Sequence, residues 1–357
     1  MALHVISPGP STTVQDRGRL GHQDQGFSPA GVMDWRACAL ANVLVGNDRD
    51  AAVLEFALAG PELRFEQAAT IALTGADMRA TLDGEDIPSC RAVFVPAGAT
   101  LVVGPARRGQ FGYLAVSGGG IGVPAIMGSR ATSVRYGLGG LAGRALQAGD
   151  VVPLAADGSE GGNGPRVDGE TPETGRTQEA LPAMEARAVF AEDAFYGWDS
   201  ATTWVRVVPA ENLGAFESSS VEAFWREPFE VTGRSDRMGY RLTGPQLRLT
   251  RAGGIVSEGI ALGTIQAPPD GEPIVVLADH QTTGGYAKIG TVASCDIPRL
   301  VQCTPGRALR FERIAVAQAQ QLLRDDVAYL RNLRATIERE ASREAERAAA
   351  AGEDAQA

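Results

Sequence analysis

The sequence predicts a mainly β protein made of two related β units, with a few short helices and a helix near the C-terminal end. Three observations support this fold class: apolar segments are short, Gly (44) and Pro (20) are frequent among 357 residues, and one phrase occurs in both halves. Short runs rich in Val, Ile, Leu and Phe and bounded by Gly, Pro or Asp-Gly are typical of strands. Such runs are TIALTG (70–75), AVFVPAG (92–98), TLVVG (100–104), YLAVSGGG (113–120), VVPLA (151–155), WVRVV (204–208), PIVVLA (273–278) and ALRFERI (308–314).

The repeated phrase suggests two copies of one β unit. LAGPELRF (58–65) is followed by an Asp-Gly-Glu turn that begins at Asp83, and LTGPQLRL (242–249) is followed at nearly the same distance by one that begins at Asp270. An alternative is coincidence, because Gly-Pro and Asp-Gly are common turn pairs. Two related barrels side by side would form a cleft between them.

Two helices are expected outside the strands. MDWRACALANVLVGN (33–47) has apolar residues at helical spacing, with Asp34 as a plausible N-cap and Gly46 as a plausible end. The second is predicted near the C-terminal end by an apolar stripe at Leu323, Val327, Leu330 and Ile337, which fades into alternating charge.

A stretch with almost no large apolar side chain separates the two halves. It runs ADGSEGGNGPRVDGETPETGRTQEALP, and it cannot bury enough surface to offset the entropy of ordering it. We therefore expect a disordered linker or loop there. The predicted organisation is a first β-barrel half, this linker, a second β-barrel half, and a charged C-terminal helix and tail, at 1–155, 156–182, 183–316 and 317–357.

Composition excludes several classes of protein. The formal net charge is −10 and no cluster of Lys and Arg is present, so we expect no nucleic-acid partner. The four Cys and three His show no metal-ligand spacing, so we expect no metal site. We find no signal-peptide pattern at the start and no apolar stretch long enough to span a membrane, and so expect a cytoplasmic protein without a membrane partner.

Familiar catalytic motifs do not appear. The sequence has no phosphate-binding G-x-x-x-x-G-K-[ST] loop, no G-x-S-x-G nucleophile elbow and no H-E-x-x-H zinc helix. GGGIGVPA (118–125) loosely matches a dinucleotide fingerprint, but Pro124 follows at once and no amphipathic helix comes after it. We interpret that segment as a β turn.

The strongest polar cluster is GTIQAPPDGEPIVVLADHQTTGGYAK (263–288), in which a buried strand leads into a run of hydrogen-bonding side chains. A carboxamide can donate and accept, so Gln266 and Gln281 suit an amide, ureido or lactam group. Lys288 is a candidate for stabilising an oxyanion or a phosphoryl group. The structural alternative is that the threonines cap a turn, Asp279 accepts from backbone N–H groups and Tyr286 packs its ring. His280 is expected to be an exposed neighbour and not a catalyst.

Three further segments carry candidate site residues. TGRSDRMGYRL (232–242) supplies Asp236, Arg237 and Arg241, which could recognise a carboxylate or phosphate or form an Asp–Arg pair within the turn. The segments 7–34 and 128–150 are rich in polar residues and Gly, and either line the same cleft or are solvated loops. Their candidate cleft residues are Thr13, Gln15, Asp16, Arg19, Asp34 and Arg130.

Ten motifs together resemble a known family. In order they are TTVQDRGRLG, GVMD, AN.LVGN, LTGAD, YLAVSGG, GSRAT, GRALQAGD, SDRMGYRL, GTIQAPPDGEPIVVLAD and QTTGGYAKI, and they cover about residues 5–316. They resemble the family of 5-oxoprolinase C subunits, also called KipA, PxpC or allophanate hydrolase subunit 2. That family is similar to the second half of the carboxyltransferase domain of urea carboxylase, which implies a pair of cyclophilin-like β-barrels.

The resemblance implies an enzyme component that opens 5-oxoproline to L-glutamate with ATP, together with a KipI-type B subunit and usually a third component, the A subunit. In that reading Lys288, Asp279 and Gln281 are catalytic, and Arg237 or Arg241 holds the substrate carboxylate. The other predicted substrate-binding residues are Asp236, Gln266, Asp270, Thr282, Thr283 and Tyr286. VVPAEN (207–212) departs from the family pattern and leaves the substrate identity open.

Two other functions remain possible from the sequence. The chain could be a carboxyltransferase component for a urea-like acceptor. Biotin would then be on another polypeptide, because this sequence contains no Met-Lys-Met biotin acceptor and no ATP-grasp signature. It could also be a regulatory protein that binds a KipI-type partner without catalysis.

Overall fold

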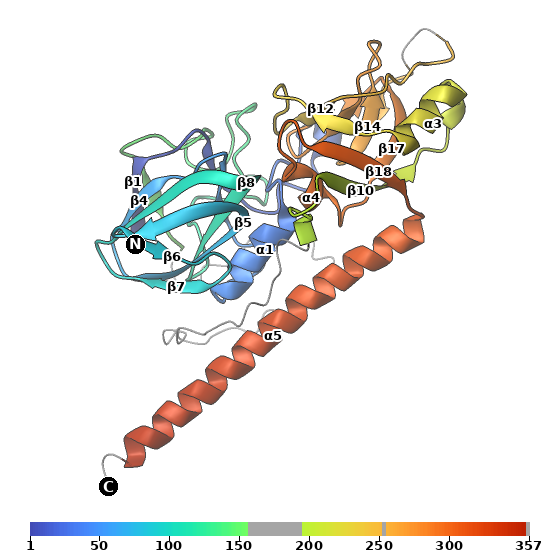
Figure 1. Cartoon of the computed structure of the whole chain (residues 1–357). Helices are drawn as coiled ribbons and strands as arrows, with labels where there is room; N and C mark the ends of the chain where they lie inside the picture. The colour runs from blue at the N-terminus through green and yellow to red at the C-terminus, as the bar shows by residue number, and fades with distance from the viewer. Residues whose placement is uncertain (156–194, 252–254, 355–357) are drawn as a thin grey trace.

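The protein is mainly β, and its two halves lie side by side above a long C-terminal helix (Figure 1). The structure is a computed structural model that describes residues 1–155, 195–251 and 255–354, with side chains to residue 343. The linker predicted at 156–182 lies outside the described residues. The fold class expected from the sequence is confirmed.

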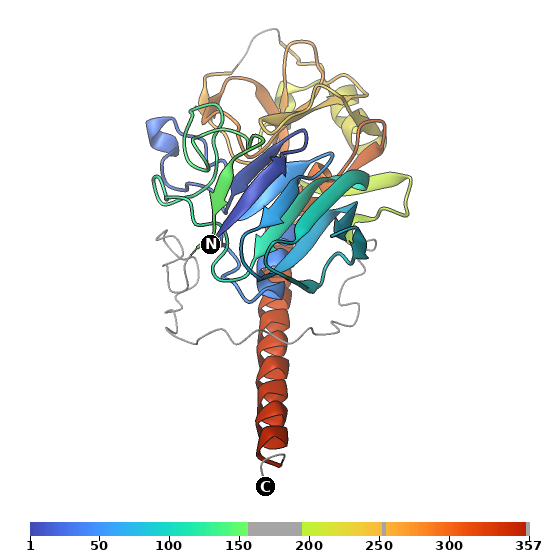
Figure 2. The same cartoon turned by 90° about the vertical axis from the view of Figure 1, so that its left-hand side faces the viewer.

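A nine-stranded sheet forms the N-terminal half. Its main path runs β2-β3-β8-β4-β1-β9, and β5 joins β8 with β6 and β7 beside it. Figure 2 shows these strands lying side by side. Their bounds are β1 (Ala2–Ser7), β2 (Thr12–Gln15), β3 (Val53–Ala57), β4 (Glu62–Phe65), β5 (Ala69–Leu82), β6 (Glu85–Ile87), β7 (Ala92–Val95), β8 (Thr100–Val116) and β9 (Val151–Pro153).

Strand β8 corrects one sequence expectation. The runs 100–104 and 113–120 were expected as separate strands, but Thr100–Val116 is one strand of 17 residues. Gly104 and Pro105 do not end it, and Gly109 adopts a positive φ of 80° within it. The register between β5 and β8 shifts three times along this stretch, so the potential breakers act as bulges.

The strands of the C-terminal half close into a barrel. Its order is β10-β17-β14-β15-β12-β11-β18. The bounds are β10 (Thr202–Pro209), β11 (Phe229–Val231), β12 (Gly239–Thr243), β14 (Thr264–Ala267), β15 (Ile274–Val276), β17 (Ala287–Val292) and β18 (Ala308–Arg313). A separate two-stranded ribbon consists of β13 (Glu258–Gly259) and β16 (Thr283–Gly284).

Four α-helices occur in the described residues: α1 (Trp35–Leu44), α3 (Ser218–Arg226), α4 (Ile297–Val301) and α5 (Val316–Asp354). Two 3-10 turns, η1 (Gln23–Gln25) and η2 (Leu213–Ala215), complete the elements. The predicted cap of α1 is confirmed, because the Asp34 carboxylate accepts a hydrogen bond from the Ala37 N–H at 2.9 Å. No helix in the part of the chain that the structure describes is long and apolar enough to cross a membrane.

The repeated phrase has two different structures. After Gly60 and Pro61 the first copy forms strand β4, whereas the second copy forms only an isolated bridge between Leu249 and Phe216. Barrel closure in the C-terminal half therefore does not reproduce the N-terminal sheet strand by strand.

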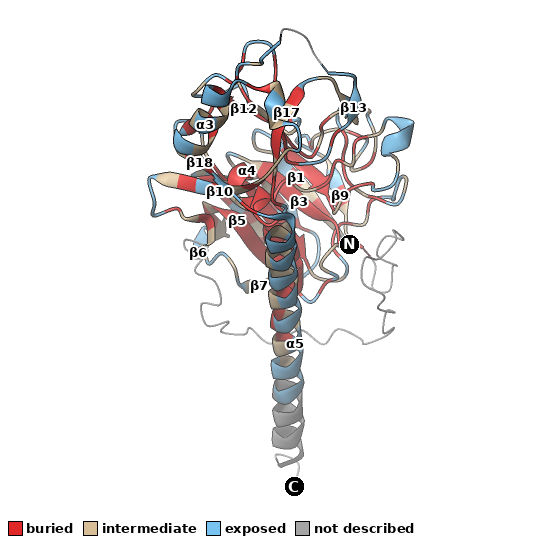
Figure 3. Ribbon diagram, turned by 90° about the vertical axis from the view of Figure 1, so that its right-hand side faces the viewer, coloured by how far each residue is buried: buried red, intermediate tan, exposed pale blue. Residues whose placement is uncertain are grey.

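One hydrophobic core joins the two halves. It includes α1, one face of the N-terminal sheet, the interior of the barrel and part of α5, while a second core lies on the other side of the N-terminal sheet. Figure 3 shows buried residues in both halves, and the buried residues of α5 lie in the middle of that helix. The Gln302 side chain connects the halves: Nε2 donates to the Asp34 carboxylate at 3.1 Å and Oε1 accepts from the Gln110 N–H at 2.8 Å. The junction between the halves is thus packed and hydrogen-bonded.

Candidate functional site

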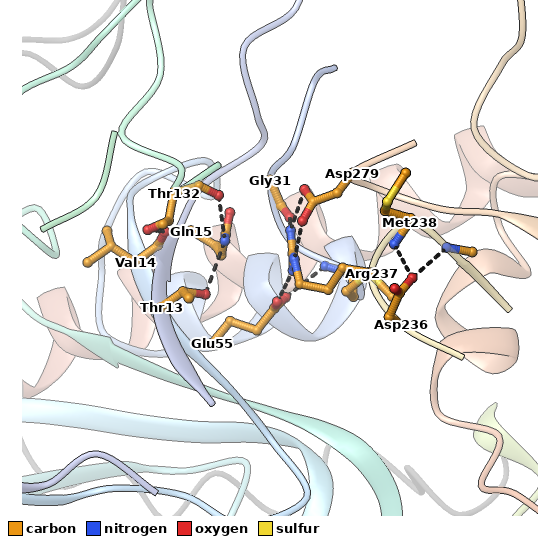
Figure 4. A network of polar contacts seen from close by, with 12 residues as sticks. Thr13, Val14, Gln15, Gly31, Glu55, Thr132, Asp236, Arg237, Met238 and Asp279 are labelled. Carbon is orange, nitrogen blue, oxygen red and sulfur yellow. Dashed lines mark hydrogen bonds and ion pairs between the residues drawn. The ribbon is translucent and has the colours of Figure 1, made fainter. Parts of the chain in front are cut away.

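Arg237 lies at the junction and contacts three segments. Its Nε donates to Asp279 Oδ2 at 2.9 Å, its Nη1 forms an ion pair with Glu55, and its Nη2 donates to the Gly31 carbonyl at 2.6 Å. Figure 4 shows the guanidinium between Glu55 of the N-terminal sheet and Asp279 of the barrel. We call Arg237, Asp279 and Glu55 the junction cluster.

Local turns hold the junction cluster in place. Asp236 Oδ1 accepts from the N–H groups of Met238 and Gly239 at 2.8 and 3.2 Å, which closes the turn that presents Arg237. The Asp279 N–H donates to the Arg237 carbonyl at 2.9 Å, so backbone and side chain both join the two segments. Asp279 lies just after β15, where the sequence changes from apolar to polar.

Glu55 was not predicted as a site residue. It lies in the middle of β3, and its Oε2 accepts from the Met33 N–H at 2.7 Å and from the Tyr113 hydroxyl at 2.9 Å. The available signal was a carboxylate inside the apolar run AAVLEFALAG, since buried acids are rare unless they are paired. The acid completes the cluster from the opposite half of the molecule.

One arginine shared by two carboxylates leaves the cluster with a net negative charge. Burial raises the pKa of Glu55, although Arg237 and the Met33 N–H oppose it. Burial lowers the pKa of Arg237, but Glu55 and Asp279 outweigh it and leave that pKa above its ordinary value. The arginine therefore stays charged, while Glu55 is the group able to take up a proton nearer neutral pH.

Polar side chains continue from the cluster across one face of the N-terminal sheet. Thr13 of β2 pairs with Glu55 of β3, which pairs with Tyr113 of β8. Gln15 lies two residues further along β2, and its Nε2 donates to Thr13 Oγ1 and to the Thr132 carbonyl, both at 3.1 Å. The Gln15 Oε1 atom has no hydrogen-bond partner among the described residues. This row leads from the junction toward the loop at 128–150.

Asp16 organises that loop. Its carboxylate accepts from the Gly18 N–H at 2.8 Å, from Ser129 Oγ at 2.6 Å and from the Arg130 N–H at 2.6 Å. The Arg130 side chain donates to the Val123 carbonyl at 2.9 Å. Arg19 is buried in the same region, and its Nη2 donates to the Ala131 carbonyl at 2.6 Å. The predicted cleft residues of the two loops thus meet in the fold.

Lys288, Gln266 and Glu258 form a second group, which we call the ribbon cluster. Lys288 pairs with Gln266 across β17 and β14, and its Nζ lies 2.8 Å from Glu258 Oε1 on the ribbon. A Cβ on Gly284 would lie 2.4 Å from Gln266 Nε2, so a side chain at this position would displace the Gln266 amide. Gln266 is buried, and its Nε2 has no partner among the described residues.

Other predicted residues lie outside both clusters. Arg241, Asp270, Thr283 and Tyr286 are exposed, while Gln281 and Thr282 are half-buried. Asp34 is fully buried and bonded to Ala37, Tyr196 and Gln302, so it joins the halves.

The expectation that His280 is exposed is wrong. Its side chain is buried because the chain turns inward there, with Nδ1 2.6 Å from the Gln281 carbonyl. Burial lowers the pKa of His280.

No group of three or more His, Cys, Asp or Glu side chains within the described ranges could hold a metal ion. The chemistry available at the junction is hydrogen bonding and proton exchange, through a fixed arginine and a buried acid with a raised pKa; unused amide atoms lie on Gln15, along the same sheet, and on Gln266 in the ribbon cluster.

Comparison with known proteins places this arrangement in a family. The model of the carboxyltransferase domain, subdomain A and B, matches residues 25–313. The chain belongs to the carboxyltransferase-domain family. Within it, the chain is 34% identical to the 5-oxoprolinase C subunit of Escherichia coli K12 over 93% of its own length and 97% of that protein.

Relatives of this carboxyltransferase-domain chain also occur inside longer proteins. The chain is 30% identical to the urea amidolyase of Saccharomyces cerevisiae over 90% of its own length and 17% of that protein. It superposes on the crystal structure of Kluyveromyces lactis urea carboxylase with a TM-score of 0.79 and 29% identity, covering 93% of this chain and 29% of that one.

Proposed function

We propose that this chain is the C subunit of an ATP-dependent 5-oxoprolinase that opens the lactam of 5-oxoproline to L-glutamate in the cytoplasm. The observation that carries the proposal is the similarity to the Escherichia coli 5-oxoprolinase C subunit over 97% of that protein's length. The proposed partners are the B subunit, of KipI type, and the A subunit of the same enzyme.

The site chemistry supports this proposal. A lactam has a carbonyl that accepts and a ring N–H that donates, and the cluster regions contain an unused amide donor on Gln266 and an unused acceptor on Gln15. Opening the ring requires a proton on the leaving nitrogen. The raised pKa of buried Glu55 lets the junction hold such a proton, while the Glu55 oxygens themselves are occupied by Met33, Tyr113 and Arg237. Arg237 fixes the orientation of Glu55 and Asp279.

Neither cluster fits the triphosphate of ATP. Arg237 is already shared by two carboxylates, and Lys288 is paired with Glu258. A triphosphate requires several unshared cationic or backbone donors. We therefore expect ATP to bind outside these two clusters, where the activation of the lactam carbonyl would begin.

Reconstitution tests the proposal. The chain is mixed with the purified A and B subunits, and glutamate and ADP formed from 5-oxoproline are measured. We expect turnover only when all three proteins, ATP and 5-oxoproline are present. A complex that assembles but forms no glutamate would contradict the assignment.

Two arginines of one turn provide a matched pair for the site. Arg237→Met removes the ion pair that joins Glu55 to the barrel half and should lower kcat at least about a hundredfold, which corresponds to about 2.7 kcal/mol. Arg241→Met is the control, because the Arg241 side chain is exposed on β12. Equal turnover of the two variants would separate the junction cluster from catalysis.

A carboxyltransferase component is the second candidate, favoured by the superposition on urea carboxylase. The ureido ring of biotin has the same carbonyl and N–H edge as a lactam, so an unused amide donor or acceptor, as on Gln266 or Gln15, suits either ring chemically. Biotin would then be carried by another polypeptide. Co-purification with a biotinylated protein and transfer of carboxylate to urea would support this function over the first.

A further inference from the structure

Arg19 is a buried arginine whose guanidinium is only partly used. The residue is 1% exposed, and its only hydrogen bond among the described residues runs from Nη2 to the Ala131 carbonyl at 2.6 Å. Its Nε and Nη1 atoms have no partner in this part of the chain. Burying charged donors without partners is costly, so such an arrangement points to a group that binds there.

The nearby carboxylates do not complete Arg19. Asp16 and Asp279 act on it only through space and counter the lowering of its pKa by burial. The Asp16 oxygens already accept from Gly18, Ser129 and Arg130, and Asp279 is paired with Arg237. The unused donors of Arg19 are therefore available to an additional anion.

Unused polar atoms lie on the same loop segment. Gln15 is fully buried, and its Nε2 bonds the carbonyl of Thr132, the residue after the one that Arg19 bonds. Gln15 Oε1 is an unused acceptor, and the buried Ser133 hydroxyl next along the chain is also without a partner among the described residues. Arg19, which has unused donors, and Gln15, which has an unused acceptor, thus bond the carbonyls of the consecutive residues Ala131 and Thr132.

The loop approaches the backbone carbonyl that Arg19 bonds too closely for any side chain. Gly139 has a φ of +68°, and a Cβ there would lie 2.1 Å from the Ala131 carbonyl oxygen and 2.7 Å from Arg19 Nη2. Only glycine allows this approach, which brings the loop beside the buried guanidinium. A ligand at Arg19 would therefore be enclosed by protein, where a charged hydrogen bond is strong.

We propose that Arg19 and Gln15 bind the α-carboxylate and the adjacent ring N–H of a cyclic amide acid, an inference that rests on the proposed function. In 5-oxoproline these two groups are attached to the same carbon, so neighbouring donor and acceptor groups can recognise both. Urea has no carboxylate. The subsite therefore selects a lactam acid over a neutral ureido substrate, and it assigns the carboxylate to Arg19 and not to Arg237 or Arg241.

Binding to the full-length chain tests this subsite. The probes are 5-oxoproline and 2-pyrrolidinone, which has the same ring without the carboxylate, and affinities are measured by isothermal titration calorimetry. We expect the wild-type protein to bind 5-oxoproline at least about tenfold more tightly, as one charge-assisted hydrogen bond predicts. Equal affinities, or no binding of 5-oxoproline, would overturn the proposal without any variant.

Substitution then identifies the arginine. Arg19→Met should abolish the preference for 5-oxoproline and leave the melting temperature of the unliganded protein unchanged or higher, because an unpaired buried charge is removed. Arg19→Lys should keep part of the preference. Arg17→Met is the control: this residue lies two positions away and pairs with Asp50 at 3.3 Å. Retention of the full preference by Arg19→Met, with a lower melting temperature, would show a structural arginine and contradict the proposal.

The outcome separates the subsite from the proposed function. Carboxylate-dependent binding that needs Arg19, with no turnover in the reconstituted complex, would support the subsite and contradict the 5-oxoprolinase assignment. Turnover in the reconstituted complex with a KM for 5-oxoproline that Arg19→Met leaves unchanged would support the 5-oxoprolinase assignment and contradict the subsite.

Discussion

The junction cluster and the ribbon cluster place charged groups from one stretch of sequence in opposite environments. Asp279 and Lys288 are nine positions apart, yet the first joins the two halves and the second pairs within the barrel half. Glu55, at the junction, is 3% exposed, whereas Glu258, on the ribbon, is 51% exposed. The difference teaches that the partner and its burial, more than residue type, decide what a charged group contributes.

The comparison also separates two kinds of polar atom. At the junction the charged groups are saturated by one another and by backbone groups, so they hold geometry and a proton. Beneath the ribbon Gln266 is buried with an unused amide, and beside the junction Arg19 is buried with unused donors. The saturated groups position the site, and the unsaturated groups are the ones open to a ligand.

The largest expected effect comes from breaking the junction. Glu55→Ala leaves the Tyr113 hydroxyl and the Met33 N–H without their acceptor and removes one of the two carboxylates that pair with Arg237. We expect the free energy of unfolding to fall by about 3–5 kcal/mol, as for the loss of one partner of a buried ion pair. Urea denaturation measures it. A loss below about 1 kcal/mol would show that the junction cluster contributes no more to stability than a surface ion pair.

Gln302→Ala tests whether hydrogen bonds or only packing unite the halves. The substitution leaves Asp34 short of a donor and removes the acceptor of the Gln110 and Phe111 N–H groups. We expect a loss of about 2–3 kcal/mol, because buried polar groups lose partners. Thermal unfolding followed by calorimetry would show it, and two separate transitions would indicate that the halves also uncouple. An unchanged melting temperature would show that the Gln302 hydrogen bonds do not contribute to the connection.

The raised pKa of Glu55 predicts a pH dependence of stability. Between the pKa of an unfolded glutamate, about 4.3, and its higher folded value, the folded protein holds more protons than the unfolded chain. This group's contribution therefore falls as pH rises through that window, by about 1.4 kcal/mol for each unit of pKa difference.

Glu55→Gln serves as the measurement of that contribution, because glutamine cannot titrate. The unfolding free energies of wild type and Glu55→Gln are compared from about pH 4 upward. As pH rises, the wild type should lose stability relative to Glu55→Gln. A difference that is constant with pH would show that Arg237 keeps the acid at its ordinary pKa.

The smallest effect is expected at the ribbon. A double-mutant cycle of Lys288→Met and Glu258→Ala should give a coupling energy below about 1 kcal/mol, since both side chains are partly solvated. Stability and turnover are measured for each variant. Coupling as large as that of Arg237 with Glu55 would remove the distinction between the clusters, and unchanged turnover in Lys288→Met would remove any catalytic part for Lys288.

Local patterns in the sequence were enough for much of the fold. The Asp34 cap of α1, the mainly β class and most strand positions follow from short-range chemistry. Bulges were not predictable in the same way: Gly104 and Pro105 are residue types that usually end a strand, but they lie inside β8.

The candidate site depended on long-range contacts that sequence patterns do not contain. The polar run at 278–288 was recognisable, but its partner Glu55 lies far away in the sequence, on an apolar strand of the other half. Nothing local indicates that Asp279 faces the other half while Lys288 faces the ribbon, or that His280 is buried. Barrel closure and the junction decide these orientations.

Helix α5 has a mechanical consequence for the whole molecule. It leaves the barrel after β18, and its Leu330, Leu333 and Ile337 pack into the core that α1 shares, with Asp326 3.5 Å from Arg36 of α1. A rod anchored to both lobes resists hinge-like rotation of one against the other. A force applied to its projecting end (Figure 1) would thus act on the core packing that the two halves share.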